Sequence, residues 1–343
     1  MSTVTSVEAP AAVRELEYGP AINEAFTELL ESDPTVLLIG QGLYSPWYVG
    51  SSMVALEKRF GTDRVIDCPV SENATTGMAI GAAMAGMRTV MVHPRMDFMV
   101  LATDQILNQA SKAHYMFGGA INVPVVIRGI INRGGEQAAQ HSQALQSLYM
   151  NIPGLKVVMP STAYDAKGLL IASVYDGNPV IYIDDRWLYT QMGPVPEGLY
   201  KVPLGKGAIR REGRDVTIVA TSYMNVEALK AAEALAIDGI ECEVVDPRTL
   251  KPLDEDLIYS SVAKTGRLVV ADAAWRMCGA AAEIAALVGE NAFDHLKAPI
   301  QRVTLAEAPA PASSPLEKAY YPWAEDVINA VRKTLDLSRK EDR

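Results

Sequence analysis

The chain has 343 residues, of which 49% are hydrophobic and 21% charged, and its formal net charge is −10. This composition is typical of a globular protein with a large core, and the length suits roughly two domains. The acidic charge argues against nucleic acid or an anionic membrane surface as the main partner, and no apolar run reaches the ~18 residues that would predict a membrane span.

The cysteines and the first residues indicate a cellular location. Cys68, Cys242 and Cys278 match no zinc-binding spacing and cannot all pair. We therefore expect reduced thiols in a cytoplasmic protein. Residues 1–17 lack the basic-then-apolar order of a signal peptide, and we expect a flexible N-terminal arm there.

The next segment, to about residue 200, alternates apolar strands with helices. Ile22, Phe26 and Leu29 fall on one face of a helix expected over 18–32, and Ser161 is expected to cap a helix that runs to about residue 175. The strand–helix alternation predicts βαβ units and a mostly parallel sheet. Strands are expected at 35–39, 64–66, 88–92, 123–127, 155–159 and 180–183, and further helices at 56–60, 78–85, 99–117 and 142–150.

The alternation relaxes near residue 200 and then restarts, which predicts a second open α/β domain. We therefore divide the chain into an arm (1–17), a first domain (18–200) and a second domain (201–343). The second domain shows no evident catalytic constellation. Its expected strands are 215–220, 242–245, 267–270 and 301–305, and its expected helices are 226–237, 257–263, 280–288 and 324–335.

One carboxylate, Glu72, is placed where a short strand turns into a small-residue helix. Ligands of open α/β sheets bind at that edge. A helix N-terminus favours the charged carboxylate, whereas burial among Val70, Ala74 and Met78 would favour the neutral form. Glu72 is thus either a group that shares a proton with a ligand nitrogen or a carboxylate that only stabilises the helix dipole.

The chain has four histidines, and their settings differ. His114 lies inside an expected helix and His295 near a turn, so both are interpreted as structural. His93 directly follows a strand and precedes Pro94, and His141 closes a long Gly- and Gln-rich loop, where an imidazole can serve as an acid or base. No nucleophile elbow, dinucleotide-binding fingerprint or P-loop is present, which argues against those three enzyme classes.

Several ordered motifs together resemble one enzyme family. The chain is similar, over nearly its whole length beyond residue 17, to the beta subunit of the thiamine-diphosphate-dependent dehydrogenase component of 2-oxo-acid dehydrogenase complexes (pyruvate, branched-chain or acetoin type). Each motif alone is weak, and the ordered set is specific. The motifs are the runs 67–73, 81–86, 104–108, 115–119, 141–143, 153–161, 165–169, 246–254 and 264–266.

The resemblance implies a pyrimidine-binding domain followed by a transketolase C-terminal-like domain, and an active site shared between two chains. In that family a separate alpha subunit binds the diphosphate of thiamine diphosphate through Mg²⁺, in an assembly of two alpha and two beta chains. The diphosphate signature of alpha subunits is absent from this sequence. The family's activity is decarboxylation of a small-molecule 2-oxo acid, with acyl transfer to a lipoyl carrier on an acyltransferase core.

The resemblance also implies roles for individual residues. Glu72 matches the glutamate that hydrogen-bonds a pyrimidine ring nitrogen and promotes loss of the thiazolium C2 proton. Phe98 matches an aromatic residue against the pyrimidine, with a core Phe as the alternative, and Val70 matches an apolar residue near that ring. His141 matches a loop histidine involved in proton transfer during acyl transfer. Positions that bind K⁺ through backbone carbonyls in some members correspond to Ser173, Asp176 and Asn178.

Three departures from the family pattern concern the substrate entrance. Gln41 stands where an acidic residue is usual, and the loop near Pro311 lacks the usual aromatic residue. His93 and Arg95 replace part of an acidic and aromatic run. His93 and Arg95 either bind an acidic or phosphorylated substrate or form an exposed pair beside Pro94.

Two other functions remain open at this point. One is a split transketolase-type or acyloin-forming enzyme, which transfers a two-carbon unit without a lipoyl carrier. The other is a non-catalytic partner that only completes an alpha subunit, and the presence of Glu72 argues against it.

Overall fold

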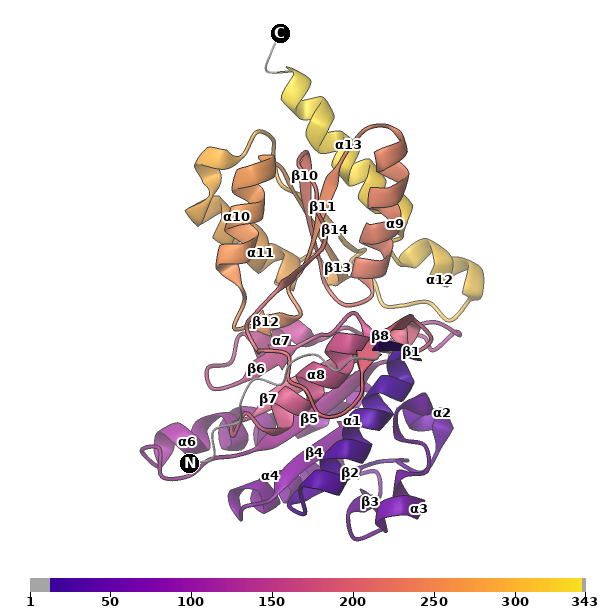
Figure 1. Ribbon diagram of the computed structural model, residues 1–343, viewed down its shortest axis with the longest axis vertical. Coiled ribbons are helices and arrows are strands. Elements are labelled where there is room, and N and C mark those ends of the chain that lie inside the picture. Colours follow the sequence, from indigo (N-terminus) through magenta and orange to yellow (C-terminus); the bar gives the residue numbers. More distant parts are fainter. Residues whose placement is uncertain (1–12, 341–343) are drawn as a thin grey trace.

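Two sheets, one above the other in Figure 1, organise the chain in a computed structural model that describes residues 13–340. The larger sheet has seven strands in the order β12-β6-β7-β5-β4-β2-β3, and every strand pairs in parallel except β12. Its strands are β2 (Val36–Gly40), β3 (Val65–Asp67), β4 (Arg88–His93), β5 (Val125–Ile131), β6 (Lys156–Val158), β7 (Val180–Asp185) and β12 (Thr249–Lys251).

Helices cover both faces of this sheet, which is why its central strand β5 is buried at every residue. Val126 and Ile130 of β5 pack in one apolar cluster with α1 and α8, while Ile127 and Ile131 pack in a cluster on the other face. The helical segments are α1 (Tyr18–Ser32), α2 (Pro46–Val49), η1 (Gly50–Met53), α3 (Leu56–Phe60), α4 (Glu72–Met84), α5 (Met96–Met99), η2 (Val100–Ala102), η3 (Gln105–Ala110), α6 (Ser111–Met116), α7 (Gln146–Met150), α8 (Ala163–Val174) and η4 (Arg186–Leu188).

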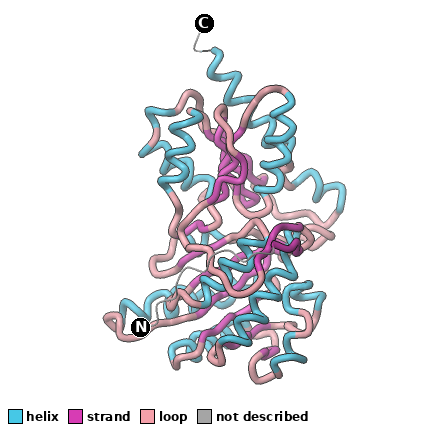
Figure 2. Tube along the Cα trace, viewed as in Figure 1, coloured by secondary structure: helices cyan, strands magenta, loops and turns pink. Residues whose placement is uncertain are grey.

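The smaller sheet has five strands in the order β14-β13-β10-β11-β9, with only β9 antiparallel. Figure 1 shows α10 and α11 on one side of it and α9 and α13 on the other, and Figure 2 shows the two strand groups separated along the long axis. The elements are β9 (Ala208–Arg211), β10 (Val216–Ala220), α9 (Met224–Ile237), β11 (Cys242–Asp246), α10 (Glu255–Thr265), β13 (Leu268–Trp275), α11 (Ala280–Asn291), η5 (Phe293–His295), β14 (Gln301–Leu305), α12 (Ser314–Tyr320) and α13 (Ala324–Lys340).

The structure confirms the expected α/β class with two mostly parallel sheets and differs from the sequence-based expectations in detail. The helix expected over 99–117 consists of several short segments, one of which (η3) has π-type hydrogen bonds. Thr162, not Ser161, caps α8, because the Thr162 side chain accepts a hydrogen bond from the backbone N–H of Asp165. Ser161 instead donates to Asp246. Among residues 13–340 no helix is long and apolar enough to span a membrane.

Two short antiparallel strand pairs connect segments that are distant in the chain. Most of the arm expected over 1–17 lies outside the described residues, and its last five residues form β1 (Val13–Glu17), which pairs with β8 (Met192–Pro196). β12 follows β11 in the chain but pairs with β6 of the larger sheet. The second half of the chain thus contributes an edge strand to the first.

A buried ionic cluster also connects the two halves. The carboxylate of Asp165 on α8 accepts hydrogen bonds from Arg248 Nη1 at 3.0 Å and from Arg210 of β9. Arg210 also binds Asp246 at 2.7 Å, and both carboxylates are fully buried. Because a buried charge is costly without a partner, these contacts hold the two sheets in one relative orientation.

Candidate functional site

Glu72 is the first residue of α4 and begins the face of that helix that packs on the sheet. The buried positions are Glu72, Thr75, Thr76, Ala79, Ile80 and Ala83. Only 6% of Glu72 is exposed, and its carboxylate has no hydrogen-bond or ion-pair partner among residues 13–340. Its carboxylate oxygens are not among the side-chain atoms sealed from solvent, so a ligand that brings its own N–H or proton can reach them.

Glu72 is buried, but the expectation that Val70, Ala74 and Met78 bury it is wrong. Val70 is 77% exposed, and Ala74 and Met78 are exposed as well. The reason is the helical period, since positions 74 and 78 fall on the outer face of α4 while 72, 75, 76 and 79 face inward. Val70 lies two residues before Glu72, outside the helix, and does not pack against the core.

His93 ends β4 and is connected to the helix that begins with Glu72. Its Nε2 lies 3.2 Å from Oγ1 of Thr76, one turn beyond Glu72. His93 is only 1% exposed, and its Nδ1 has no hydrogen-bond partner. Burial disfavours the imidazolium and lowers the pKa of His93 to about 4. The ring is therefore neutral at pH 7.

Phe98 and His141, predicted from different parts of the chain, are brought together. The ring of His141 lies edge-on to the ring of Phe98, with centroids 5.4 Å apart and an interplanar angle of 85°. Both side chains are half-buried. Phe98 follows β4 and His141 follows β5, and these neighbouring parallel strands end at the same edge of the sheet.

Asp97 holds this pair from one side, and its place before Phe98 was the only sequence signal for it. Its Oδ1 accepts hydrogen bonds from the backbone N–H of Gln143 at 3.2 Å and from the Gln143 amide at 2.7 Å. Burial raises the pKa of Asp97, opposed by the Gln143 hydrogen bonds and by nearby His141. Asp97 and Gln143 thus tie the Phe98 segment to the His141 loop.

The loop that carries His141 is anchored by the other domain. The carboxylate of Glu317 on α12 accepts hydrogen bonds from the N–H groups of Gly134 at 3.1 Å and Glu136 at 3.3 Å. In return, Glu136 accepts from the N–H of Ser314 at 3.1 Å. A side chain at residue 134 would meet the Trp187 indole at 2.2 Å, and φ there is +82°, so glycine is required.

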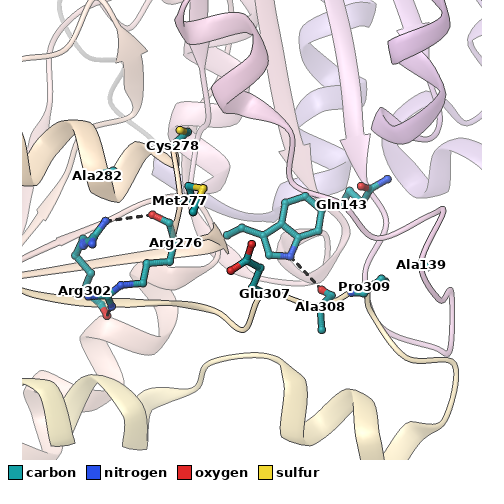
Figure 3. Close-up of a pocket in the computed structure, with 11 residues that line it drawn as sticks. Ala139, Gln143, Arg276, Met277, Cys278, Ala282, Arg302, Glu307, Ala308 and Pro309 are labelled. Carbon is teal, nitrogen blue, oxygen red and sulfur yellow. Dashed lines mark hydrogen bonds between the residues drawn. The ribbon is translucent and has the colours of Figure 1, made fainter.

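A cavity of about 940 Å³ lies between this loop and the second domain. Figure 3 shows Ala139 and Gln143 on one side, and Arg276 and Arg302 on the other. Trp275 forms part of the wall and donates its indole N–H to the carbonyl of Ala308 at 3.1 Å. The second domain, which showed no catalytic constellation in the sequence, thus supplies one wall of a cavity next to the His141 loop.

Arg95 and His93 do not form an exposed pair, because both side chains are buried. Arg95 Nη1 donates to the carbonyls of Pro94 at 2.9 Å and Tyr48 at 3.5 Å. Gln41, at the end of β2, is also buried, and its amide nitrogen has no partner. Gln41, His93 and Arg95, which depart from the family pattern, are therefore all buried at the carboxyl ends of β2 and β4.

The three residues matched to a K⁺ site lie at the end of α8, away from Glu72 in the chain. The Ser173 carbonyl accepts the N–H of Asp176 at 3.3 Å, and Lys156 pairs with Asp176 at 2.5 Å. The side-chain oxygen of Asn178 is buried without a partner. Within residues 13–340, no group of three His, Cys, Asp or Glu side chains is arranged to hold a metal.

Comparison with known proteins identifies both halves of the chain. The family model described as "Transketolase, pyrimidine binding domain" matches residues 14–191, and "Transketolase, C-terminal domain" matches residues 205–327. The beta subunit of acetoin:2,6-dichlorophenolindophenol oxidoreductase from Cupriavidus necator is 45% identical over 331 residues, with 94% of this chain and 98% of that protein covered. Its Bacillus subtilis counterpart is 42% identical, with 94% and 97% covered.

Pyruvate dehydrogenase subunits are similar to the same degree. The E1 component subunit beta from Rickettsia bellii is 43% identical over 321 residues, with 93% of this chain and 98% of that protein covered. The solved structure of a split-gene transketolase, described as an inactive beta4 tetramer, shares the fold with a TM-score of 0.75 at 24% identity, covering 94% of this chain and 99% of that one. The chain therefore belongs to the thiamine-diphosphate-dependent transketolase family, among the E1 beta subunits of 2-oxo-acid and acetoin dehydrogenases, which are oxidoreductases.

Proposed function

We propose that this chain pairs with an alpha subunit in an assembly of two alpha and two beta chains that decarboxylates a 2-oxo acid on thiamine diphosphate. The acyl group then passes to a lipoyl carrier on an acyltransferase core. Mg²⁺ and the diphosphate belong to the alpha subunit in this proposal. The potassium site at Ser173, Asp176 and Asn178 and a cytoplasmic location also remain proposals.

Glu72 is the observation that carries the proposal. Glu72 is 6% exposed as a residue, and its carboxylate, which has no partner among residues 13–340, is free to bind a pyrimidine ring nitrogen. Its position as the first residue of α4 places the carboxylate at the carboxyl edge of the sheet, where it can hydrogen-bond that nitrogen.

The other predicted residues have roles that follow from their chemistry. Thiamine diphosphate, when bound, supplies a thiazolium carbon that attacks the 2-oxo carbon and holds the charge left when CO₂ departs. Phe98 packs against the pyrimidine face, and Val70 supplies an apolar contact beside it. His141 holds a proton on its imidazole during acyl transfer. Phe98 restricts the orientation of that imidazole through their edge-on contact.

Exposed apolar side chains near Glu72 support a partner chain at this edge. Val70, just before α4, and Met78, on the outer face of α4, are exposed. Val100 and Leu101 are also exposed, on η2, which contacts α4. Clusters of this kind mark protein interfaces when they lie together. An alpha subunit that covers them would also bring the second half of the cofactor site to Glu72.

The test uses the coexpressed alpha and beta chains with thiamine diphosphate and Mg²⁺. Exchange of the thiazolium C2 proton is followed by proton NMR, and 2-oxo-acid-dependent reduction of an artificial electron acceptor is followed by absorbance. Glu72→Gln should slow proton exchange at least about 100-fold, while Asn73→Gln, at the exposed neighbouring position, should not. Wild-type exchange rates in the Glu72 variant would refute the assignment.

The acyl acceptor is tested separately. Addition of lipoylated acyltransferase and coenzyme A to the active complex should yield acyl-coenzyme A. Transfer of the two-carbon unit to an added aldehyde, with no acyl-coenzyme A formed, would instead identify the transketolase-type or acyloin-forming reaction.

A further inference from the structure

Two guanidinium groups converge on one backbone oxygen at the carboxyl edge of the larger sheet. Nη1 of Arg186 lies 2.9 Å from the carbonyl oxygen of Tyr48, and Nη1 of Arg95 lies 3.5 Å from the same atom. Arg186 Nη2 also donates to the carbonyls of Pro46 and Trp47, each at 3.2 Å. Two positive charges thus share one neutral acceptor, the Tyr48 carbonyl on α2.

Neither arginine forms an ion pair with a carboxylate among residues 13–340. Arg95 is only 8% exposed, and its Nε is sealed from solvent without a hydrogen-bond acceptor. Burial and the charge of Arg186 lower the pKa of Arg95. A buried guanidinium normally binds an anion, because an unpaired charge in the interior is costly. The cluster therefore lacks its negative partner.

Gln41, the residue that follows β2, carries a further open donor. Its amide nitrogen is sealed and has no acceptor. The next residue, Gly42, lies so close to Tyr48 that an added side chain would meet the tyrosine ring at 2.6 Å. The ring of Tyr48 in turn lies 6.0 Å from the guanidinium of Arg95. Tyr48 thus contacts Arg95 and lies against the residue that follows Gln41.

This group belongs to the same sheet edge as Glu72. Arg95 follows β4, two residues after His93, whose imidazole contacts the Glu72 helix through Thr76. It precedes Phe98 by three residues, and Phe98 contacts His141. Gly40 pairs with Val92, so Gln41 and His93 leave adjacent strand ends. Arg95 therefore lies on the segment that connects His93 to Phe98, and Gln41 follows the neighbouring strand.

We propose that Arg95, Arg186 and Gln41 bind a second acidic group of the substrate. The preferred substrate is then a 2-oxo acid that ends in a carboxylate or a phosphate, not in an alkyl chain. A planar guanidinium binds either anion through two parallel hydrogen bonds. This inference rests on the proposed function, since it assigns the substrate class of that same site.

A small ligand suits the donors better than a side chain of a docking subunit does. Trp47 is 70% exposed, so a docking chain meets this residue at the surface of the loop. Arg95 and Gln41 are each 8% exposed, so their open donors are buried. A small substrate needs less rearrangement of the protein than a docking chain does to reach donors that are sealed from solvent.

Matched substrate pairs test the proposal in the alpha–beta complex. 2-Oxoglutarate and 2-oxopentanoate have the same chain length and differ only in the terminal carboxylate. 3-Phosphohydroxypyruvate supplies the phosphate form, and pyruvate is the unsubstituted reference. We expect kcat/KM to favour one of the two acidic substrates over its neutral counterpart, and Arg95→Met to lower kcat/KM for that substrate about 100-fold. The same change should lower kcat/KM for 2-oxopentanoate less than about threefold.

Arg88→Met is the matched control, because Arg88 lies at the opposite end of β4 and contacts Asp33 and Tyr175. It should leave the substrate preference unchanged. Thiazolium C2 exchange, which needs no 2-oxo acid, must persist in Arg95→Met. If the wild-type complex showed no thiazolium C2 exchange, the proposed function itself would be refuted.

Two results overturn the inference. One is an equal loss of kcat/KM for acidic and neutral substrates in Arg95→Met. The other is failure of Arg95→Met to assemble with the alpha subunit, seen by size-exclusion chromatography, while the isolated beta chain keeps its far-UV circular dichroism. That second result would assign the missing carboxylate to the partner.

Discussion

Phe98 meets His141 edge to face, with ring centroids 5.4 Å apart, although the two residues are separated by an entire strand and loop. Because Phe98 contacts both His141 and, in our proposal, the pyrimidine ring, Phe98→Ala should affect two steps at once. Loss of the aromatic face should weaken thiamine diphosphate binding roughly tenfold. Loss of the edge contact should also slow acyl transfer. Calorimetric titration and the two rate assays measure these effects separately.

His141→Asn is expected to affect only one of those steps. The change removes the group that holds the proton in acyl transfer, so transfer to a lipoyl carrier should fall about 100-fold or more. Thiazolium C2 exchange and thiamine diphosphate affinity should stay within about twofold of wild type, because catalysis of that step is assigned to Glu72. Equal losses of both activities would show that His141 acts in assembly or folding and not in transfer.

Glu317 should act as a positioning residue at a distance from the chemistry. Glu317→Gln keeps the size of the side chain but weakens the two hydrogen bonds that hold Gly134 and Glu136, since a carboxylate accepts more strongly than an amide. We expect acyl transfer to fall roughly tenfold without a change in C2 exchange. Cleavage of the loop by a protease should become faster.

The neighbouring residue Lys318 provides the control for that experiment. Its side chain is exposed on α12, so Lys318→Gln should change neither acyl transfer nor protease sensitivity. Loss of transfer in Glu317→Gln with an unchanged cleavage rate would contradict a loop-anchoring role.

Periodicity and glycine positions predicted most of the fold correctly, because they report local and face-by-face burial. The helix over 18–32 has the predicted bounds, and the strand–helix alternation indicated both parallel sheets. The environment of Glu72 was predicted incorrectly at Val70 and Met78. The helix was expected to begin at 78 and begins at 72, which places Met78 on its outer face, while Val70 precedes the helix and is exposed.

Contacts between distant segments had no local signal in the sequence. Glu317 is separated from Gly134 by most of the chain, and nothing near residue 317 indicates a hydrogen bond to a loop of the other domain. The wall formed by Trp275, Arg276 and Arg302 likewise depends on how the two sheets are oriented. Asp165, Arg210 and Arg248 fix that orientation, and their pairing follows from tertiary packing alone.

The buried imidazole of His93 predicts how stability depends on pH. Its folded pKa of about 4 lies below the ordinary value of 6.5, so the unfolded chain binds this proton more readily. The stability contributed by the neutral ring is complete above pH 6.5 and is lost as the pH falls toward 4. Complete loss of this contribution lowers the free energy of unfolding by about 3 kcal/mol.

Urea unfolding of the beta chain at pH 7.0 and pH 4.5 measures that loss. In His93→Gln, the side chain no longer titrates, so the fall in the free energy of unfolding between the two pH values should shrink by roughly 2 kcal/mol. The variant itself should be less stable at pH 7 by about 1 kcal/mol, because the contact with Thr76 is altered. His114→Gln is the control, since His114 is exposed and its substitution should leave the pH dependence as it is in the wild type. An unchanged pH dependence in His93→Gln would mean that His93 gains no proton on unfolding, and so that its ring is not held neutral by burial.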